Sequence, residues 1–396
     1  MAGGVLAGVS FLEFGLSAGE QAFVGTRPTT PPLERYAEDV LVRCKSAAYR
    51  LGCYDEEVPK LMSAISMEDA FAVTRLIQEK DPEFRFCHVL GHNLSAQEVK
   101  KDPSRWKDVL ARCPSGVCSN GCLHGGLQER FRAETLSEAE VEAIKPDLET
   151  LCEARPNWQP TGLEQGSCYH ALGHLTMYLT SADIAKATTL CEELAVKPDG
   201  RDFSPLCFDG AFMQIFQPLE PEDFALVHGK QPSKQDAAAF CRQFSGARRA
   251  SCHSESWPLF RDELMRPEGL TRFCGEAPAG QETRCYRSLV YVLTAQFNFD
   301  TRKLKDFCAG LTPEWRGFCF ANVASRLIET DYRNIEASVA LCRDGAPFDP
   351  EARCFSELVF YATYNFHAGS PEFFELCGDL PDPWRVGCLN RGGIVR

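Results

Sequence analysis

The sequence predicts an all-α protein, a right-handed α-solenoid of helix–turn–helix repeats with a period of about 34 residues. Three observations support this fold: cysteines that recur periodically, apolar residues spaced as on helices, and prolines gathered between paired cysteines. In the C-terminal part, the first cysteine of each pair recurs at steps of 33, 34, 34 and 35 residues. Such a fixed period is typical of arrays in which each helix pair packs against its neighbours.

The cysteine pairs share one setting. One cysteine closes an apolar segment, about ten residues follow, and a second cysteine opens the next apolar segment. The even count of 20 cysteines indicates a disulfide framework, whereas zinc knuckles need closer Cys-x2-4-Cys pairs. We therefore expect bonds within Cys44–Cys53, Cys113–Cys122, Cys152–Cys168, Cys191–Cys207, Cys241–Cys252, Cys274–Cys285, Cys308–Cys319, Cys342–Cys354 and Cys377–Cys388. The remaining two, Cys87 and Cys118, either form a tenth disulfide or stay free as thiolate metal ligands.

The apolar residues after the second cysteine of each pair have helical spacing. After Cys319, positions i, i+3, i+4, i+7 and i+8 are Phe320, Val323, Ala324, Leu327 and Ile328. The prolines between paired cysteines mark where a helix stops, and they are Pro278, Pro313, Pro347, Pro350, Pro381 and Pro383. Two of these loops contain tryptophans, Trp315 and Trp384, which we expect to wedge between neighbouring repeats.

With this period and these helix pairs, residues 36–396 resemble cysteine-rich helical-repeat proteins of the tetratricopeptide-like kind. The resemblance is one of architecture alone, because the consensus Trp-x2-Leu-Gly-x2-Tyr is not present. It implies an α-solenoid that binds another protein along its concave face. It implies no functional residues.

The chain divides into a short N-terminal segment and one long array. Residues 1–35 are expected to form an apolar leader and a proline-rich linker, residues 36–225 irregular histidine-rich repeats, and residues 226–396 regular repeats. The leader contains Glu13 and no basic residue before Arg27, so it matches neither a signal peptide nor a membrane span. Export is inferred from the cysteines instead, and it predicts a periplasmic or secreted protein in which this segment is either the tail of a membrane anchor or a packed leader.

Charge excludes one class of partner. The net charge is −13 and the isoelectric point is near 5.2, whereas a nucleic-acid-binding surface needs clustered basic residues.

A hydrophobic content of 44% is ample for a buried core.

Five of the eight histidines lie between residues 88 and 174. The string His-x-Leu-Gly-His occurs twice and places two imidazoles on one helical face, a spacing by which helices offer two ligands to one ion. His124 and His170 both stand two residues after the second cysteine of a pair, and Asp209 takes that place one repeat later. The candidate metal ligands are therefore His88, His92, His124, His170, His174 and Asp209. Glycines about one turn away are expected to permit close helix contact, and they are Gly91, Gly125, Gly126, Gly173 and Gly210.

Two functions remain open. One is a binding scaffold, in which duplicated histidines are structural; the other is a metalloprotein or metalloenzyme. Imidazole-rich ligation favours copper or zinc, with iron as the third candidate. An enzyme would also need an open coordination position and a proton acceptor, for which Asp209 and Glu129 are candidates. The sequence has no Gly-x-Ser-x-Gly, phosphate-loop, dinucleotide or His-Glu-x-x-His motif, and His228, His253 and His367 are expected at the surface or in loops.

Overall fold

The structure is a computed structural model that describes residues 32–394, apart from 115–116, 133–136, 157 and 220. Within these residues every regular element is a helix, and β-type pairing is limited to three isolated bridges. The predicted all-α class is therefore confirmed. The leader and linker predicted for residues 1–35 lie almost wholly outside the described residues.

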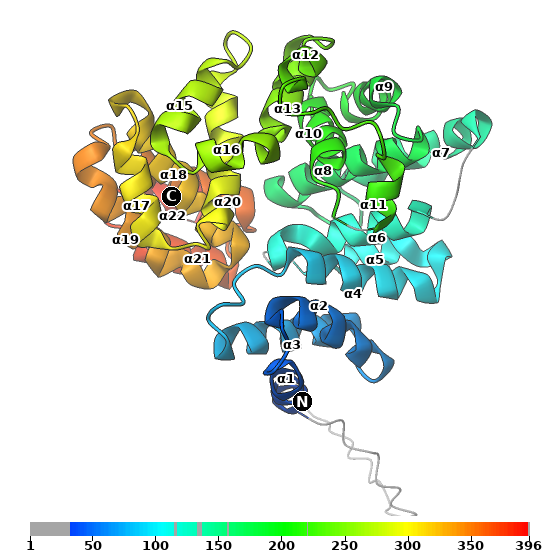
Figure 1. Cartoon of the computed structure of the whole chain (residues 1–396). Coiled ribbons are helices and arrows are strands. Elements are labelled where there is room, and N and C mark those ends of the chain that lie inside the picture. The colour runs from blue at the N-terminus through cyan, green and yellow to red at the C-terminus, as the bar shows by residue number, and fades with distance from the viewer. Residues whose placement is uncertain (1–31, 115–116, 133–136, 157, 220, 395–396) are drawn as a thin grey trace, which may run out of the picture. The chain divides into compact units, whose positions relative to one another are not determined.

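Ten pairs of consecutive helices account for most of the chain (Figure 1). The first helices of the pairs are α1 (Leu33–Cys44), α3 (Met67–Lys80), α5 (Trp106–Ala111), α7 (Glu138–Leu151), α9 (Ile184–Ala195), α12 (Ala237–Cys241), α15 (Pro267–Gly275), α17 (Thr301–Gly310), α19 (Ile335–Gly345) and α21 (Pro371–Asp379). The second helices are α2 (Arg50–Lys60), α4 (His88–Lys101), α6 (Gly121–Arg132), α8 (Gly162–Leu179), α10 (Ser204–Phe216), α13 (Gly246–Glu255), α16 (Glu282–Gln296), α18 (Pro313–Thr330), α20 (Arg353–Asn365) and α22 (Trp384–Arg391).

Short elements complete the structure between these pairs. They are α11 (Pro221–Leu226), α14 (Arg261–Leu264) and the 3₁₀ turns η1 (Leu61–Ser63), η2 (Pro103–Arg105), η3 (Cys118–Asn120), η4 (Trp257–Phe260), η5 (Tyr332–Asn334) and η6 (Ala346–Phe348).

The second helices pack on one another in chain order. Each contacts the next from α2 through to α22, and α15, α17, α19 and α21 contact one another in the same successive way. A residue at a given position of a second helix therefore faces the equivalent residue one repeat later. This packing places side chains from α4, α6 and α8 side by side.

All 20 cysteines are paired in ten disulfides, which indicates an oxidising environment outside the cytosol. Nine bonds join the two helices of one pair across 9 to 16 residues, as predicted. The tenth joins Cys87 and Cys118 across 31 residues. It connects the start of α4 to η3, so the open alternative is resolved and neither sulfur is a free thiolate.

The core follows the predicted helical faces. The stripe after Cys319 is buried along the whole of its length. Trp315 stacks on Tyr286 of the preceding repeat at a ring separation of 3.9 Å, and Trp384 stacks on Phe355 at 6.2 Å. Both tryptophans thus contact the preceding repeat, as expected. Their segments, however, begin helices α18 and α22 and are not loops, because proline is well tolerated in the first turn of a helix.

Two contacts join segments that are distant in the chain. Helix α20 packs against α8, and Arg333 forms an ion pair with Glu79 at 3.0 Å. The packing thus differs from a strictly linear array, in which each repeat meets only its neighbours. The buried apolar residues form two clusters, one within residues 37–252 and the other within residues 257–388.

Across the described part of the chain, no helix has the length and apolar character needed to cross a membrane.

Candidate metal centre

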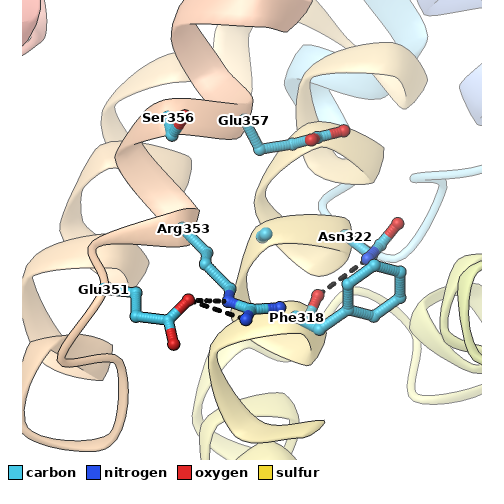
Figure 2. Close-up of a pocket in the computed structure, with 7 residues that line it drawn as sticks. Phe318, Asn322, Glu351, Arg353, Ser356 and Glu357 are labelled. Atoms are coloured by element: carbon cyan, nitrogen blue, oxygen red, sulfur yellow. Dashed lines mark hydrogen bonds and ion pairs between the residues drawn. The ribbon is translucent and has the colours of Figure 1, made fainter. Parts of the chain in front are cut away.

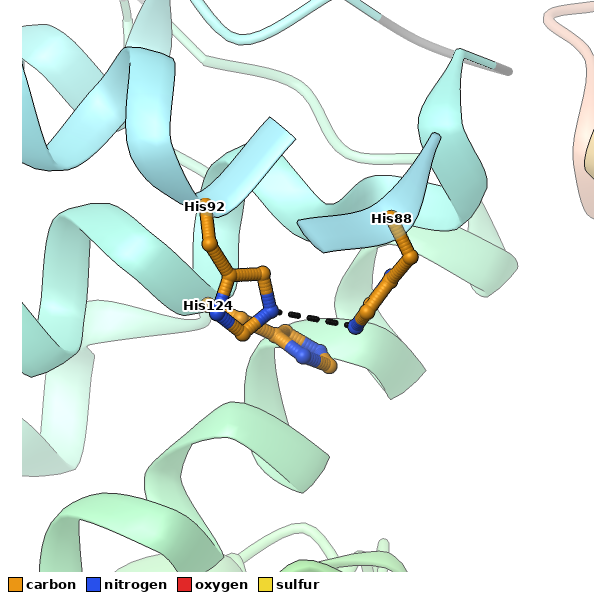
Figure 3. Close-up of side chains that lie close together, drawn as sticks. All are labelled: His88, His92 and His124. Carbon is orange, nitrogen blue, oxygen red and sulfur yellow. Dashed lines mark hydrogen bonds between the residues drawn. The ribbon is translucent and has the colours of Figure 1, made fainter. Parts of the chain in front are cut away.

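The two His-x-Leu-Gly-His strings and His124 come together in the structure. His88 and His92 lie in the first turns of α4, His124 in α6, and His170 and His174 in α8. The ring centroid of His124 lies 4.9 and 5.4 Å from those of His88 and His92. It lies 5.3 and 5.8 Å from those of His170 and His174. His124 therefore stands between the two pairs, and Figure 3 shows its ring beneath those of the first pair.

Glycines explain how the helices approach so closely. A Cβ atom at Gly125 would lie 2.2 Å from the His92 carbonyl oxygen, and one at Gly121 would lie 2.2 Å from that of His88. Each distance is too short for any side chain. Helix α6 therefore lies directly on the backbone of α4, which brings His124 to the first pair.

Glycines also allow close contact between α8 and α10. A Cβ at Gly173 would meet the Cys207 carbonyl oxygen at 2.0 Å, and a Cβ at Gly210 would meet the His170 carbonyl oxygen at 2.0 Å. The glycines predicted to permit close approach do so, except that Gly126 faces the Leu110 side chain instead of a neighbouring backbone.

Outer hydrogen bonds orient two of the rings. His88 Nδ1 lies 3.2 Å from the Cys118 carbonyl oxygen, and His174 Nδ1 lies 2.7 Å from Gln214 Oε1. Both partners are acceptors, so each Nδ1 carries the proton and each Nε2 presents a lone pair. An outer acceptor of this kind is a regular feature of metal-binding histidines.

Burial keeps these imidazoles neutral. It lowers the pKa of His88 to about 4, and the positive charge of Arg326 adds to the effect. Burial also lowers the pKa of His124 and His170 well below the usual range, helped by neighbouring imidazoles. The pKa of His174 falls for the same reason, although its hydrogen bond to Gln214 opposes the shift. Neutral imidazole is the form that binds a metal.

The residues fit a transition metal ion. One nitrogen each from His88, His92 and His124 lies within 4.8 Å of the others, so small side-chain rotations bring the three to a common ion. In the part of the chain that the structure describes, this is the single group of three or more such side chains at that spacing. His124 Nδ1 is buried and has no hydrogen-bond partner, which is costly unless the nitrogen binds something else. His92 and His124 are buried, whereas His88 and His170 are partly exposed and leave access from solvent.

The carboxylates named from sequence have other partners. Asp209 forms an ion pair with Arg284 at 2.7 Å, and Glu129 forms one with Lys100 at 3.4 Å. Both carboxylates are thus paired with a cation. Asp209 thus keeps the predicted register position but not the predicted neighbours.

The other three histidines lie elsewhere. His228 and His367 are exposed and lie between helices, as predicted. The prediction for His253 was wrong: it lies on α13, partly buried, with its ring stacked on Phe273 at 4.2 Å and its Nε2 2.9 Å from the Phe273 carbonyl oxygen. Stacking and this hydrogen bond give His253 a structural role.

The later repeats have a small pocket where the earlier ones have histidines. Ala321 and Ser356 stand two residues after their cysteines, the position of His124 and His170. Both line a pocket between α18 and α20 (Figure 2). There Arg353 pairs with Glu351 at 2.7 Å, Glu357 adds a second carboxylate, and the lining includes no imidazole. The small side chains show that the fold does not need histidine at this position.

Two groups of the centre were not found from sequence. They are Gln214 and the Cys118 carbonyl oxygen, the outer acceptors of His174 and His88. Gln214 lies 40 residues from its partner in the chain, and no local pattern pairs the two. The one sequence feature that could have indicated this pairing is the order of the repeats, which places α10 directly after α8.

Comparison of the chain with protein-family models, with curated proteins and with solved structures finds no match. What is established is a disulfide-rich helical protein with a buried group of three histidines that can hold a metal ion.

Proposed function

We propose that this chain is an exported helical-repeat protein, a right-handed α-solenoid, that binds a transition metal ion through His88, His92 and His124. The observation that carries the proposal is the approach of three imidazoles, from two helices in close contact at glycine residues, to within 4.8 Å of one another. A set of three nitrogen ligands suits zinc or copper, and iron is less favoured because no carboxylate joins the imidazoles. Ten disulfides support function in the periplasm or outside the cell.

Three protein ligands leave a coordination position for water or another small ligand, the arrangement found in catalytic zinc sites. A metalloenzyme is therefore the second candidate function. Asp209 and Glu129 are ion-paired with Arg284 and Lys100, so a metal ion here would supply hydroxide by lowering the pKa of its bound water, and the proton would leave to solvent. A protein partner along the concave face stays a prediction.

Elemental analysis of protein purified from an oxidising compartment tests the proposal. We expect a stoichiometric transition metal in the native chain and its loss in the variant His88→Ala with His92→Ala. The matched control is His228→Ala with His367→Ala, which removes two exposed imidazoles and should leave the metal content unchanged. A metal-free native protein that also fails to take up zinc or copper on addition would contradict the proposal and leave the scaffold function alone.

A further inference from the structure

The second histidine pair has the spacing of two ligands on one ion. His170 Nε2 and His174 Nε2 lie 3.3 Å apart in a long hydrogen bond, and His88 Nε2 and His92 Nε2 of the first pair lie 3.0 Å apart in the same way. Two nitrogens bound at about 2.0–2.1 Å to one tetrahedral ion are separated by about 3.3–3.4 Å. The 3.3 Å between the two nitrogens thus equals the spacing of two ligands on one ion, and little movement would bring both to a metal.

Neighbouring groups also orient the second histidine pair, as they orient the ligands of metal sites. Gln214 fixes the ring of His174 and directs the lone pair of its Nε2 toward His170 Nε2. Gly173 and Gly210 hold α8 against α10, so the amide that orients the ring is itself fixed in place. The first pair has the matching arrangement, with the Cys118 carbonyl oxygen behind His88. The two His-x-Leu-Gly-His strings thus carry equivalent outer hydrogen bonds.

His124 is the one residue within reach of both pairs. Its ring centroid is about as far from His170 and His174, at 5.3 and 5.8 Å, as from His88 and His92, at 4.9 and 5.4 Å. An imidazole has two nitrogens on different edges of the ring, and His124 Nδ1 is buried without a hydrogen-bond partner. One nitrogen is sufficient for a single ion, so the second is available for another.

We propose that the centre holds two divalent transition metal ions that share His124. The first ion takes His88, His92 and one nitrogen of His124; the second takes His170, His174 and the other nitrogen. Among the described residues, the group whose ligand atoms approach within 4.8 Å is His88, His92 and His124, so binding of the second ion requires the side chains of His124, His170 and His174 to turn toward one another. Binding of the second ion displaces the remaining ring proton of His124 to solvent, since both nitrogens then donate lone pairs. This inference rests on the proposed function and extends it.

Metal stoichiometry tests the second ion. The full chain is stripped of metal, loaded with zinc, dialysed and assayed, and we expect two ions per chain. The variant His170→Ala with His174→Ala should retain one ion, as should His88→Ala with His92→Ala, whereas the control His228→Ala with His367→Ala should retain two. One ion in the native chain, unaffected by loss of His170 and His174, would overturn the second ion but leave the proposed function standing. No ion at all would overturn both.

Electron paramagnetic resonance of the copper(II)-loaded native chain tests the sharing of His124 without relying on any variant. Two copper ions joined through one imidazole couple magnetically, so the signal of isolated copper(II) should be largely lost. The variant His124→Ala, checked for native helix content by circular dichroism, should bind less copper and regain the isolated signal. Two bound ions with a full isolated signal in the native chain would show that His124 is not shared.

Discussion

At the scale of single residues, the histidines of the centre combine burial with neutrality. His88 is held by a hydrogen bond to a backbone carbonyl, which fixes its proton on Nδ1. Burial, with Arg326 as a second cause, lowers its pKa from 6.5 to about 4. The folded chain therefore keeps this ring uncharged and ready for a metal at pH values where an exposed histidine is already protonated.

This shift predicts how the stability of the metal-free protein depends on pH. Between pH 6.5 and about 4, the unfolded chain binds a proton at His88 and the folded chain does not, so stability is full above pH 6.5 and falls with the pH. At about 1.4 kcal/mol per pKa unit, the loss due to His88 reaches about 3 kcal/mol near pH 4. Urea unfolding of the metal-free protein at several pH values should show this decline, and His88→Gln should make it shallower. An equal slope in the variant would contradict the lowered pKa.

Sequence was a good guide to these residues and a poor guide to their partners. The spacing i, i+4 and the register after the second cysteine were sufficient to select His88, His92, His124, His170 and His174. The same register selected Asp209, which instead binds Arg284, 75 residues away in the chain. The position of a residue in the repeat determines where it lies on its helix. The partners of its side chain depend on tertiary packing, which a local sequence pattern does not specify.

At the scale of secondary-structure elements, close contact between second helices builds the centre. Gly173 lies between His170 and His174, and its missing side chain lets α8 rest on the backbone of α10. Glycine in a helix interior lowers helix stability by up to about 1 kcal/mol relative to alanine. Here this local loss accompanies the close packing of two helices. The sequence indicated this role through the placement of Gly125, Gly173 and Gly210 beside the histidines. The sequence did not distinguish these three glycines from Gly126. Adjacent residues on a helix point about 100° apart, so Gly126 faces a different neighbour from Gly125.

Gly173→Ala should therefore be destabilising although alanine favours helices. The new Cβ would lie 2.0 Å from the Cys207 carbonyl oxygen, so α8 and α10 must separate, at a cost of about 1–3 kcal/mol. The matched control is Gly387→Ala in α22, where nothing lies within 4 Å of the added atom and a gain of about 0.5–1 kcal/mol is expected. Urea unfolding measures both variants. Equal stabilisation by both would show that the close contact at Gly173 is not real.

At the scale of the whole molecule, disulfides constrain the chain in two ways. Nine of them close short segments within one helix pair, and their pairing followed from the sequence because the partners are neighbours in a periodic pattern. The bond between Cys87 and Cys118 instead joins two repeats. The sequence did not decide whether Cys87 and Cys118 form a disulfide, because two leftover cysteines beside a histidine cluster are also suitable metal ligands. The long-range contact of α20 with α8 was not predicted either, since the period describes only neighbouring repeats.

Removing two of these bonds should separate stability from metal binding. In the chain-entropy model, loss of Cys377–Cys388 costs about 3 kcal/mol and loss of the longer Cys87–Cys118 loop about 4 kcal/mol. Cys87 immediately precedes His88, and the Cys118 carbonyl oxygen orients the His88 ring, so only the second loss should disturb the centre. Urea unfolding of the metal-free proteins and zinc affinity together test this for Cys87→Ala with Cys118→Ala and for Cys377→Ala with Cys388→Ala. The first variant should bind zinc more weakly, by about 10- to 100-fold as for other outer-shell changes, and the second should bind it normally. Equal zinc affinity in both variants would mean that the bond between repeats stabilises the fold without positioning His88.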